Sequence, residues 1–138
     1  MDNNVFIKLT ATEIIDGQEE TFEINVHGQL EKKNEITKIC YSEDLEGLGI
    51  EETEITIDKD SVLIFRKGAL NCEMLIRQGE RNTTFYDTSL GKLTIGIYGK
   101  KVSFSEDNGK FHLILSYSLD FNNDYFSEKH LDFIIEEK

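Results

Sequence analysis

Apolar and polar residues alternate one by one along most of the chain. The pattern is clearest in residues 5–11, 22–30 and 111–121, where an apolar residue or glycine recurs at every second position. A period of two is typical of β-strands that bury one face, and no stretch shows the 3.6-residue period of an amphipathic helix. The pattern therefore predicts an all-β protein.

Two dipeptides, Asp16-Gly17 and Asn108-Gly109, mark tight turns between such strands. Each is a strong signal for a two-residue hairpin loop, and such a loop fixes the register of its strands. The predicted pairs are Ala11–Phe22, Leu9–Ile24, Ile7–Val26, Phe104–Leu113 and Val102–Leu115. Because directly opposed residues share a face, the turn chemistry and the apolar pattern agree.

Residues 53–91 form the centre of the predicted sheet, because they contain four short strands with turn residues at each reversal. A turn at Lys59-Asp60 places Thr53 opposite Arg66. The same register gives the apolar pairs Ile57–Val62 and Ile55–Ile64. A three-residue loop around Gly68 then adds Leu70, Cys72, Met74 and Ile76 to the inner face.

Two registers are open for the strand before this centre. A two-residue loop at Lys33-Asn34 turns Ile39, Tyr41 and Glu43 inward, opposite Gly28, Val26 and Ile24. A loop one residue longer turns Ile36, Lys38 and Cys40 inward instead. We prefer the first, because it leaves Lys38 in water. Residues 44–52 follow as a longer connection, which we interpret as a short lid carrying Leu45, Leu48 and Ile50.

Two places leave the register open. Around Gly79–Asn82 the alternation does not decide whether Phe85 or Tyr86 points inward, and around Gly99–Lys101 a bulge and an extra hairpin both fit. The last strand has Leu131, Phe133 and Ile135 as its core face. The chain thus predicts one domain, residues 1–138, built as an antiparallel meander. Closure into an up-and-down β-barrel of about 8–10 strands removes exposed edges and is the first choice, and a two-sheet sandwich is the second.

The net charge of −12 limits the expected partners. So acidic a surface repels phosphate backbones and anionic lipids, so neither nucleic acid nor a membrane is expected as a partner. The first residues show no basic leader, and no stretch approaches the ~20 apolar residues of a membrane span, which predicts a cytoplasmic protein. Cys40 and Cys72 face opposite sides of the predicted sheet, so we expect neither a disulfide nor a zinc site.

Several short motifs occur in the order and spacing of a known family. They are YSE (Tyr41–Glu43), TEITI (Thr53–Ile57), LIFRKG (Leu63–Gly68), YDTSLG (Tyr86–Gly91) and LSYSL (Leu115–Leu119), with Met74 and Gly79 between them. Through these motifs the chain resembles the YwiB-like family of uncharacterised bacterial proteins. Thr56 departs from the family pattern, which has lysine at this outward position. The resemblance implies a calycin-like (lipocalin-like) β-barrel in a bacterial cytoplasm and implies no activity.

The residues that catalysis commonly uses do not form a known pattern in this sequence. His27 and His112 fall on outward positions, the glycines fit no phosphate-binding motif, and no serine lies in a nucleophile elbow. We therefore expect neither an enzyme nor a cofactor or metal site.

One polar cluster falls on the inward face of the predicted barrel. In the preferred register Glu43 lies opposite Thr53, which lies opposite Arg66, and Tyr41 lies one step deeper. One interpretation is a buried ion pair between Arg66 and Glu43 that closes one end of the core. The other is a ligand-holding cavity in which Arg66 binds an anionic group.

Two functions fit these observations. The first is a non-catalytic barrel that binds a small anionic or apolar ligand, and the second is a structural or protein-interaction domain with a filled core. The second would act through its outer surface, where Leu63, Phe65 and Leu75 share an outward patch. Clustered apolar residues on a surface are typical of interfaces, so a homodimer through this patch is a further hypothesis.

Overall fold

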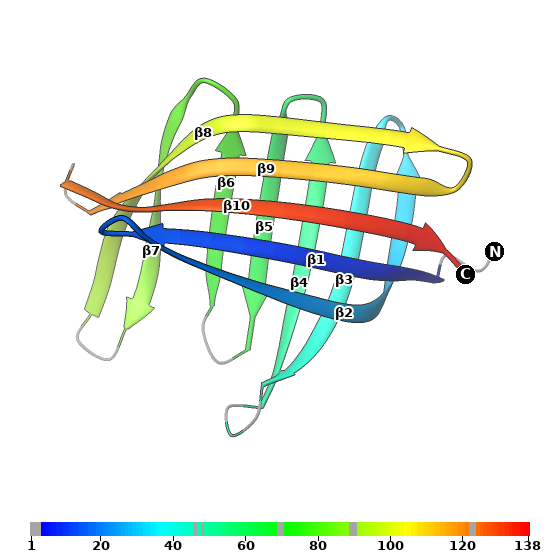
Figure 1. Ribbon diagram of the computed structural model, residues 1–138, viewed down its shortest axis with the longest axis horizontal. Helices are drawn as coiled ribbons and strands as arrows, with labels where there is room; N and C mark the ends of the chain where they lie inside the picture. The colour runs from blue at the N-terminus through cyan, green and yellow to red at the C-terminus, as the bar shows by residue number, and fades with distance from the viewer. Residues whose placement is uncertain (1–3, 46, 48, 69–70, 89–90, 122–123) are drawn as a thin grey trace.

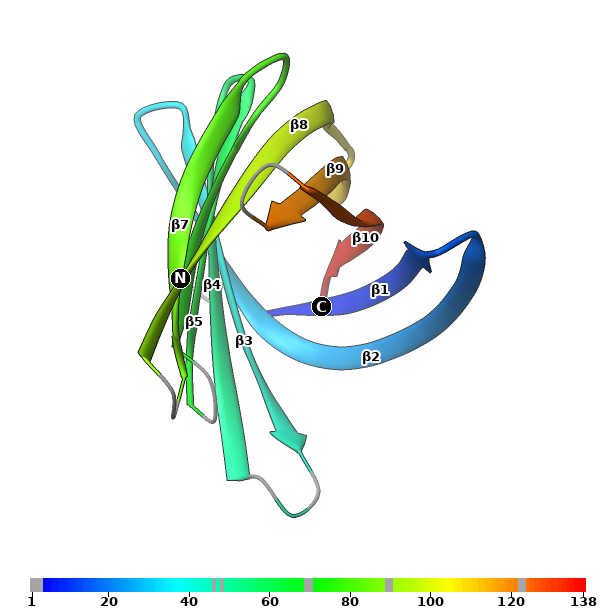
Figure 2. The ribbon, with the colours of Figure 1, turned by 90° about the vertical axis from the view of Figure 1, so that its left-hand side faces the viewer.

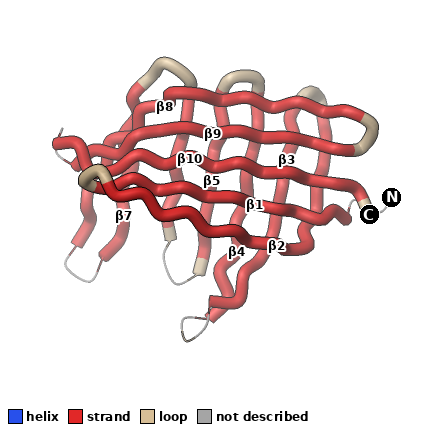
Figure 3. Tube along the Cα trace, viewed as in Figure 1, coloured by secondary structure: helices blue, strands red, loops and turns tan. Residues whose placement is uncertain are grey.

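The computed structural model describes residues 4–45, 47, 49–68, 71–88, 91–121 and 124–138. These residues form ten β-strands, and none of them is helical (Figure 1, Figure 3). The strands are β1 (Asn4–Ile15), β2 (Gln18–Lys33), β3 (Ile36–Leu45), β4 (Gly49–Asp58), β5 (Ser61–Lys67), β6 (Cys72–Arg77), β7 (Arg81–Thr88), β8 (Gly91–Asp107), β9 (Lys110–Phe121) and β10 (Asp124–Glu137).

The strands pair in the order β6-β5-β4-β3-β2-β1-β10-β9-β8-β7. Neighbours in the sheet are therefore neighbours along the chain, except that β1 pairs with β10. The sheet curls until β6 approaches β7, so that the strands surround a common interior (Figure 2). The result is a nearly closed barrel of ten antiparallel strands, which confirms the predicted meander barrel.

Alternate residues of several strands fill this interior. Along β9 the odd-numbered residues from Phe111 to Leu119 are buried, and β1 alternates in the same way. The hairpins at Asp16-Gly17 and Asn108-Gly109 have the predicted registers. Phe22 pairs with Ala11 as predicted, but its side chain is 55% exposed because it lies at an opening into the barrel.

Gly28 allows the long strand β2 to pass from one part of the sheet to the other. It pairs with Val5 of β1 on one side and with Tyr41 of β3 on the other. A Cβ atom on Gly28 would lie 2.5 Å from the Cys40 carbonyl oxygen and 2.7 Å from Ile7 Cδ1. Real Cβ atoms do not approach other atoms so closely, so the bend at this point requires glycine.

The open question around Gly99–Lys101 is answered by a bulge. Strand β8 is continuous from Gly91 to Asp107, and its register against β9 shifts between Gly99 and Lys101. A Cβ on Gly99 would lie 2.3 Å from the Arg77 carbonyl oxygen. The bulge therefore lies where the backbone at the end of β6 comes close to β8.

The barrel has one seam, between β6 and β7, where the described residues form no ladder of backbone hydrogen bonds. Thr84 donates its hydroxyl hydrogen bond to the Glu73 carbonyl across this seam. In the segment that joins β6 to β7, Gly79 N–H donates to the Gly99 carbonyl at 2.8 Å, and Gly99 N–H donates to the Glu80 carbonyl at 3.1 Å. Thr84 is buried and Phe85 is exposed, while the side chain of Tyr86 lies outside the described residues.

Two details of the central strands differ from the prediction. The turn after β2 is at Asn34-Glu35, both at positive φ, so Tyr41 pairs with Gly28 and not with Val26. The same inward set results, because a shift of two residues preserves the facing of a strand. The β5–β6 loop is also longer than predicted, which pairs Arg66 with Cys72, and Leu70 lies outside the described residues.

The predicted lid at residues 44–52 is instead a continuation of the β3–β4 hairpin. Asp44 pairs with Ile50, and the ladder ends at the pair Leu45–Gly49. Ile50 is 65% exposed, while Leu48 and the Leu45 side chain lie outside the described residues. Because the two strands run further than expected, Glu43 and Glu51 become cross-strand neighbours.

Candidate functional site

A pocket of about 320 Å³ lies at the end of the barrel where β3 and β4 extend as a hairpin. Its walls combine apolar, aromatic and charged side chains. The lining residues are Leu9, Ala11, Thr12 and Glu13 of β1, Phe22 and Ile24 of β2, Tyr41 and Glu43 of β3, Glu51 of β4, Arg66 of β5, Tyr117 of β9, and Lys129 and Leu131 of β10. Mostly apolar walls with a few convergent polar groups are typical of small-molecule sites.

Arg66 lies on the inward face of β5 opposite Thr53, as predicted. Its nearest ion-pair partner is not Glu43 but Glu51, with Arg66 Nε and Glu51 Oε1 3.9 Å apart. The predicted pairing of Glu43 with Thr53 is therefore wrong, because Thr53 faces Tyr41 and Glu43 faces Glu51. Glu51 shares the inward phase of Thr53, so the alternation would have identified it had residues 44–52 been assigned to strands.

The Arg66 guanidinium is partly buried and makes no hydrogen bond within the described part of the chain. Burial lowers the pKa of Arg66, but Tyr117, Tyr41, Cys72 and Glu51 together outweigh this effect and raise it. At neutral pH the phenols and the thiol are uncharged, so Glu51 supplies the negative charge. The pocket therefore contains a permanent cation whose donor groups are largely unused.

Glu43 is half-buried in the same pocket, and no described side chain forms an ion pair with it. Burial raises the pKa of its carboxyl, the positive charge of Arg66 lowers it, and the negative charge of Glu51 raises it. The net shift is upward. Among the charged groups that line the pocket, the Glu43 carboxylate is thus the one without an opposite charge at ion-pair distance among the described residues.

Tyr41 and Thr53 form the next inward-facing pair of β3 and β4 after Glu43 and Glu51. Burial raises the pKa of the Tyr41 phenol, and Arg66 acts in the opposite direction. The buried Thr53 hydroxyl lies beside the Tyr41 phenol and acts to lower its pKa, but it makes no hydrogen bond of normal geometry to a described group. Of the four predicted site residues, Tyr41, Glu43 and Arg66 line the interior pocket, whereas Thr53 does not.

The opposite wall carries its own charged pair, Lys129 Nζ and Glu13 Oε2, which lie 3.2 Å apart. Glu13 and Lys129 stand outside the runs of clear alternation, so no pattern in the sequence points to either residue. Between the two walls lie the apolar side chains of Leu9, Ala11 and Leu131. The pocket thus combines apolar side chains with two charged pairs from different strands.

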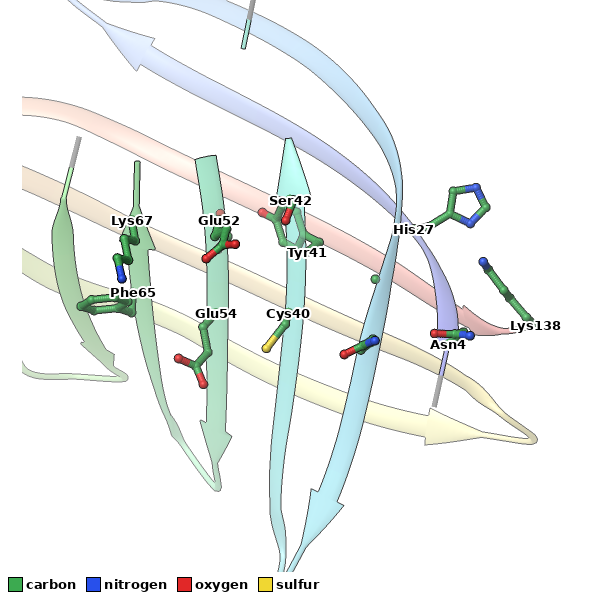
Figure 4. A pocket seen from close by; sticks show the side chains of 13 residues that line it. Asn4, His27, Cys40, Tyr41, Ser42, Glu52, Glu54, Phe65, Lys67 and Lys138 are labelled. Carbon is green, nitrogen blue, oxygen red and sulfur yellow. The ribbon is translucent and has the colours of Figure 1, made fainter. Parts of the chain in front are cut away.

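A second hollow, of about 690 Å³, lies on the outer surface of β3, β4 and β5. Figure 4 shows Cys40, Glu54 and Phe65 on these three neighbouring strands, with Lys67 beside Phe65. Burial raises the pKa of the Cys40 thiol, and nearby Glu54 raises it further. A thiol shifted in this direction is a poor nucleophile at neutral pH, so the groove lacks an activated cysteine.

The three histidines occupy separate places on the strands. His27 lies 4.8 Å from the Phe6 ring, His112 Nε2 lies 2.8 Å from Asp132 Oδ1, and His130 Nδ1 lies 2.5 Å from the Ser116 hydroxyl. Across the described ranges, no group of three or more potential metal ligands comes together. Nor does the part of the chain that the structure describes contain a helix that could cross a membrane.

The fold and the pocket together define a small antiparallel β-barrel protein with an accessible interior pocket at one end. The sequence matches the family described as Domain of unknown function (DUF1934) over residues 7–133, and the chain belongs to that family. Among solved structures, the chain is similar to the crystal structure of the ywiB protein from Bacillus subtilis, with 19% identity and a TM-score of 0.87. The match covers 99% of this chain and 92% of that one, and it confirms the family indicated by the sequence motifs. A search of the curated proteins found no match.

Proposed function

We propose that this protein is a non-catalytic binding protein that holds a small ligand in the interior pocket of its barrel. Arg66 binds an anionic group of the ligand, and Leu9, Ala11 and Leu131 contact its apolar part. The observation that carries this proposal is a guanidinium that lines a cavity and makes no hydrogen bond to the described residues.

The chemistry of arginine supports an anionic ligand group. A guanidinium has five N–H donors in a planar fork that matches a carboxylate or phosphate. Glu51 is 3.9 Å from Arg66 Nε, which is too far for a hydrogen bond. Because the Arg66 side chain is only 31% exposed, water satisfies its donors incompletely, and a bound anion would complete their hydrogen bonding.

The pocket is also of suitable size and composition. Its volume of about 320 Å³ falls at the lower end of the range for small-molecule sites, about 300–1,000 Å³. The described residues show no nucleophile held by a general base inside the pocket, which supports binding without a reaction. The net charge of −12 supports a protein without nucleic-acid or membrane partners, and a cytoplasmic location belongs to the same proposal.

Native mass spectrometry of freshly purified protein tests this function. A retained ligand appears as an added mass on the wild-type protein, and Arg66→Met removes it. Lys67→Met is the matched control, because Lys67 is the next residue and is exposed on the outer face. Equal retention by wild type and Arg66→Met would show that Arg66 does not hold the ligand.

A second candidate function is association through the outer surface. Leu63 and Leu75 are direct cross-strand neighbours on β5 and β6, and Phe65 is 39% exposed and lines the outer groove. An apolar cluster of this kind supports a homodimer. If a dimer forms through this patch, Phe65→Lys makes the protein monomeric in sedimentation experiments, and an unchanged dimer would exclude the patch as the interface.

A further inference from the structure

The charged residues of the interior pocket do not balance. The lining contains three carboxylates, of Glu13, Glu43 and Glu51, and two cations, Arg66 and Lys129. Glu13 pairs with Lys129 at 3.2 Å, and Glu51 lies 3.9 Å from Arg66. Glu43 remains as a partly buried carboxylate with no ion pair among the described residues.

The position of Glu43 affects what Arg66 can bind. Glu43 faces Glu51 across the β3–β4 hairpin, and Arg66 on the neighbouring strand β5 acts electrostatically on both Tyr41 and Glu43. An anionic ligand group on Arg66 would therefore lie within the electrostatic reach of the Glu43 carboxylate. In a partly buried site such like charges repel, because little water screens them.

A ligand avoids this repulsion if it also carries a positive group that pairs with Glu43. We infer that the pocket binds a small zwitterion, an α-amino carboxylate with an apolar side group, whose carboxylate pairs with Arg66 and whose ammonium pairs with Glu43. This inference rests on the proposed function and deepens it by naming the ligand class. The apolar side group contacts Leu9, Ala11 and Leu131.

The apolar residues explain why a side group is part of the ligand class. Leu9, Ala11 and Leu131 are almost fully buried, and Phe22 stands 55% exposed at the opening. Burying a ligand's apolar atoms against these side chains adds affinity in proportion to the buried area. A polar amino acid would gain the two charge contacts but not this contribution.

Isothermal titration calorimetry with three matched probes tests the inference. L-phenylalanine carries both charged groups, 3-phenylpropanoate carries only the carboxylate, and 2-phenylethylamine carries only the amine. All three have the same apolar body. We expect L-phenylalanine to bind at least about tenfold more tightly than either of the other two probes, because each charge-assisted contact contributes more than about 1.4 kcal/mol.

Two variants assign the contacts. Glu43→Gln is expected to remove the advantage of L-phenylalanine over 3-phenylpropanoate, and Arg66→Met is expected to remove its advantage over 2-phenylethylamine. Glu52→Gln is the matched control, because Glu52 lies beside Glu51 but points outward and is exposed. The control retains the wild-type order of affinities.

The ranking of the three probes on wild-type protein is decisive even if a variant fails to fold. If 3-phenylpropanoate binds as tightly as L-phenylalanine, the zwitterion is overturned but an anion-binding pocket remains. The same conclusion follows if 3-phenylpropanoate binds more tightly than L-phenylalanine and the protein takes up a proton on binding it. Tightest binding of 2-phenylethylamine overturns both the zwitterion and the role of Arg66. If no probe binds at millimolar concentration, the inference is overturned, while the mass of any retained ligand still decides the proposed function.

Discussion

The guanidinium of Arg81 on β7 reaches across β8 and forms two hydrogen bonds with the carboxylate of Asp120 on β9. Arg81 Nε lies 2.9 Å from Asp120 Oδ2, and Arg81 Nη2 lies 2.6 Å from Asp120 Oδ1. Gly96 of β8 pairs with Asp120 and lies directly beneath the contact. The ion pair thus ties three consecutive strands near the seam, and it can do so because the middle strand has no side chain there.

This arrangement predicts that Gly96→Ala disrupts the contact between Arg81 and Asp120. The new Cβ would lie 2.2 Å from Arg81 Nη2 and 2.5 Å from the Asp120 carboxylate oxygens, so the ion pair must move. In urea unfolding, we expect Gly96→Ala to lose part or all of the stability that alanine normally gains over glycine in a strand, because the exposed ion pair has to give way. The loss should shrink when Arg81→Met is already present, and equal losses in both backgrounds would show that the ion pair is not involved.

Arg66→Met distinguishes a binding residue from a structural ion pair. Because Arg66 and Glu51 are 3.9 Å apart and partly exposed, their attraction contributes little to folding. We expect Arg66→Met to lower the free energy of unfolding by less than about 1 kcal/mol. A loss of about 3–5 kcal/mol, typical of breaking a buried pair, would indicate a structural role instead. The double variant with Glu51→Gln reports the coupling between the two side chains.

The raised pKa of Glu43 predicts a specific dependence of stability on pH. The folded state holds the Glu43 proton more tightly than the unfolded chain, in which the carboxyl has a pKa near 4.5. The stabilisation from Glu43 is therefore complete below that value and is lost as pH rises through the higher pKa of the folded protein.

Glu43→Gln cannot ionise, so its stability relative to wild type should increase as pH rises through this window. Urea unfolding of wild type and Glu43→Gln on both sides of the window measures the difference, with Glu52→Gln as control. A difference that does not change with pH would contradict an upward shift at Glu43.

The two cysteines should behave as distinct free thiols. Cys72 is buried inside the barrel and Cys40 is partly exposed on the outer face. We expect both thiols to react with Ellman's reagent in denaturant without reductant, which would fail if a disulfide were present. In the folded protein Cys40 should react faster than Cys72, but slowly near neutral pH, because burial raises the pKa of its thiol. Cys40→Ser removes this native-state reaction.

The sequence predicts which residues face the interior much better than which residues meet. Alternation determines the facing of a strand, and a register error of two residues leaves that facing unchanged. The pattern therefore predicts the inward facing of Tyr41 and Glu43 correctly, although the turn at Asn34-Glu35 gives them other partners than expected. Where a turn was unambiguous, as at Lys59-Asp60, the predicted pair Thr53–Arg66 is present.

Which residues of the polar site contact each other depends on the strand register, so these contacts are predicted less well than the facing of the strands. If residues 44–52 are taken as a lid, Glu51 is not placed on the inward face of a strand. Glu51 is, however, the carboxylate that approaches Arg66. Lys129 and Glu13 reach the pocket from strands whose position depends on the pairing of β1 with β10. That pairing joins opposite ends of the sequence, and no local pattern specifies it.

At the seam between β6 and β7, the order of the strands along the chain differs from their pairing in the sheet. These strands follow one another along the chain but share no ladder among the described residues, whereas β1 and β10 are joined by an uninterrupted antiparallel ladder. A proteolytic cut at the exposed Gly79 would therefore break no strand pairing of the sheet. The two fragments would remain associated through β1 and β10, so this barrel is suited to reassembly from two separately produced pieces.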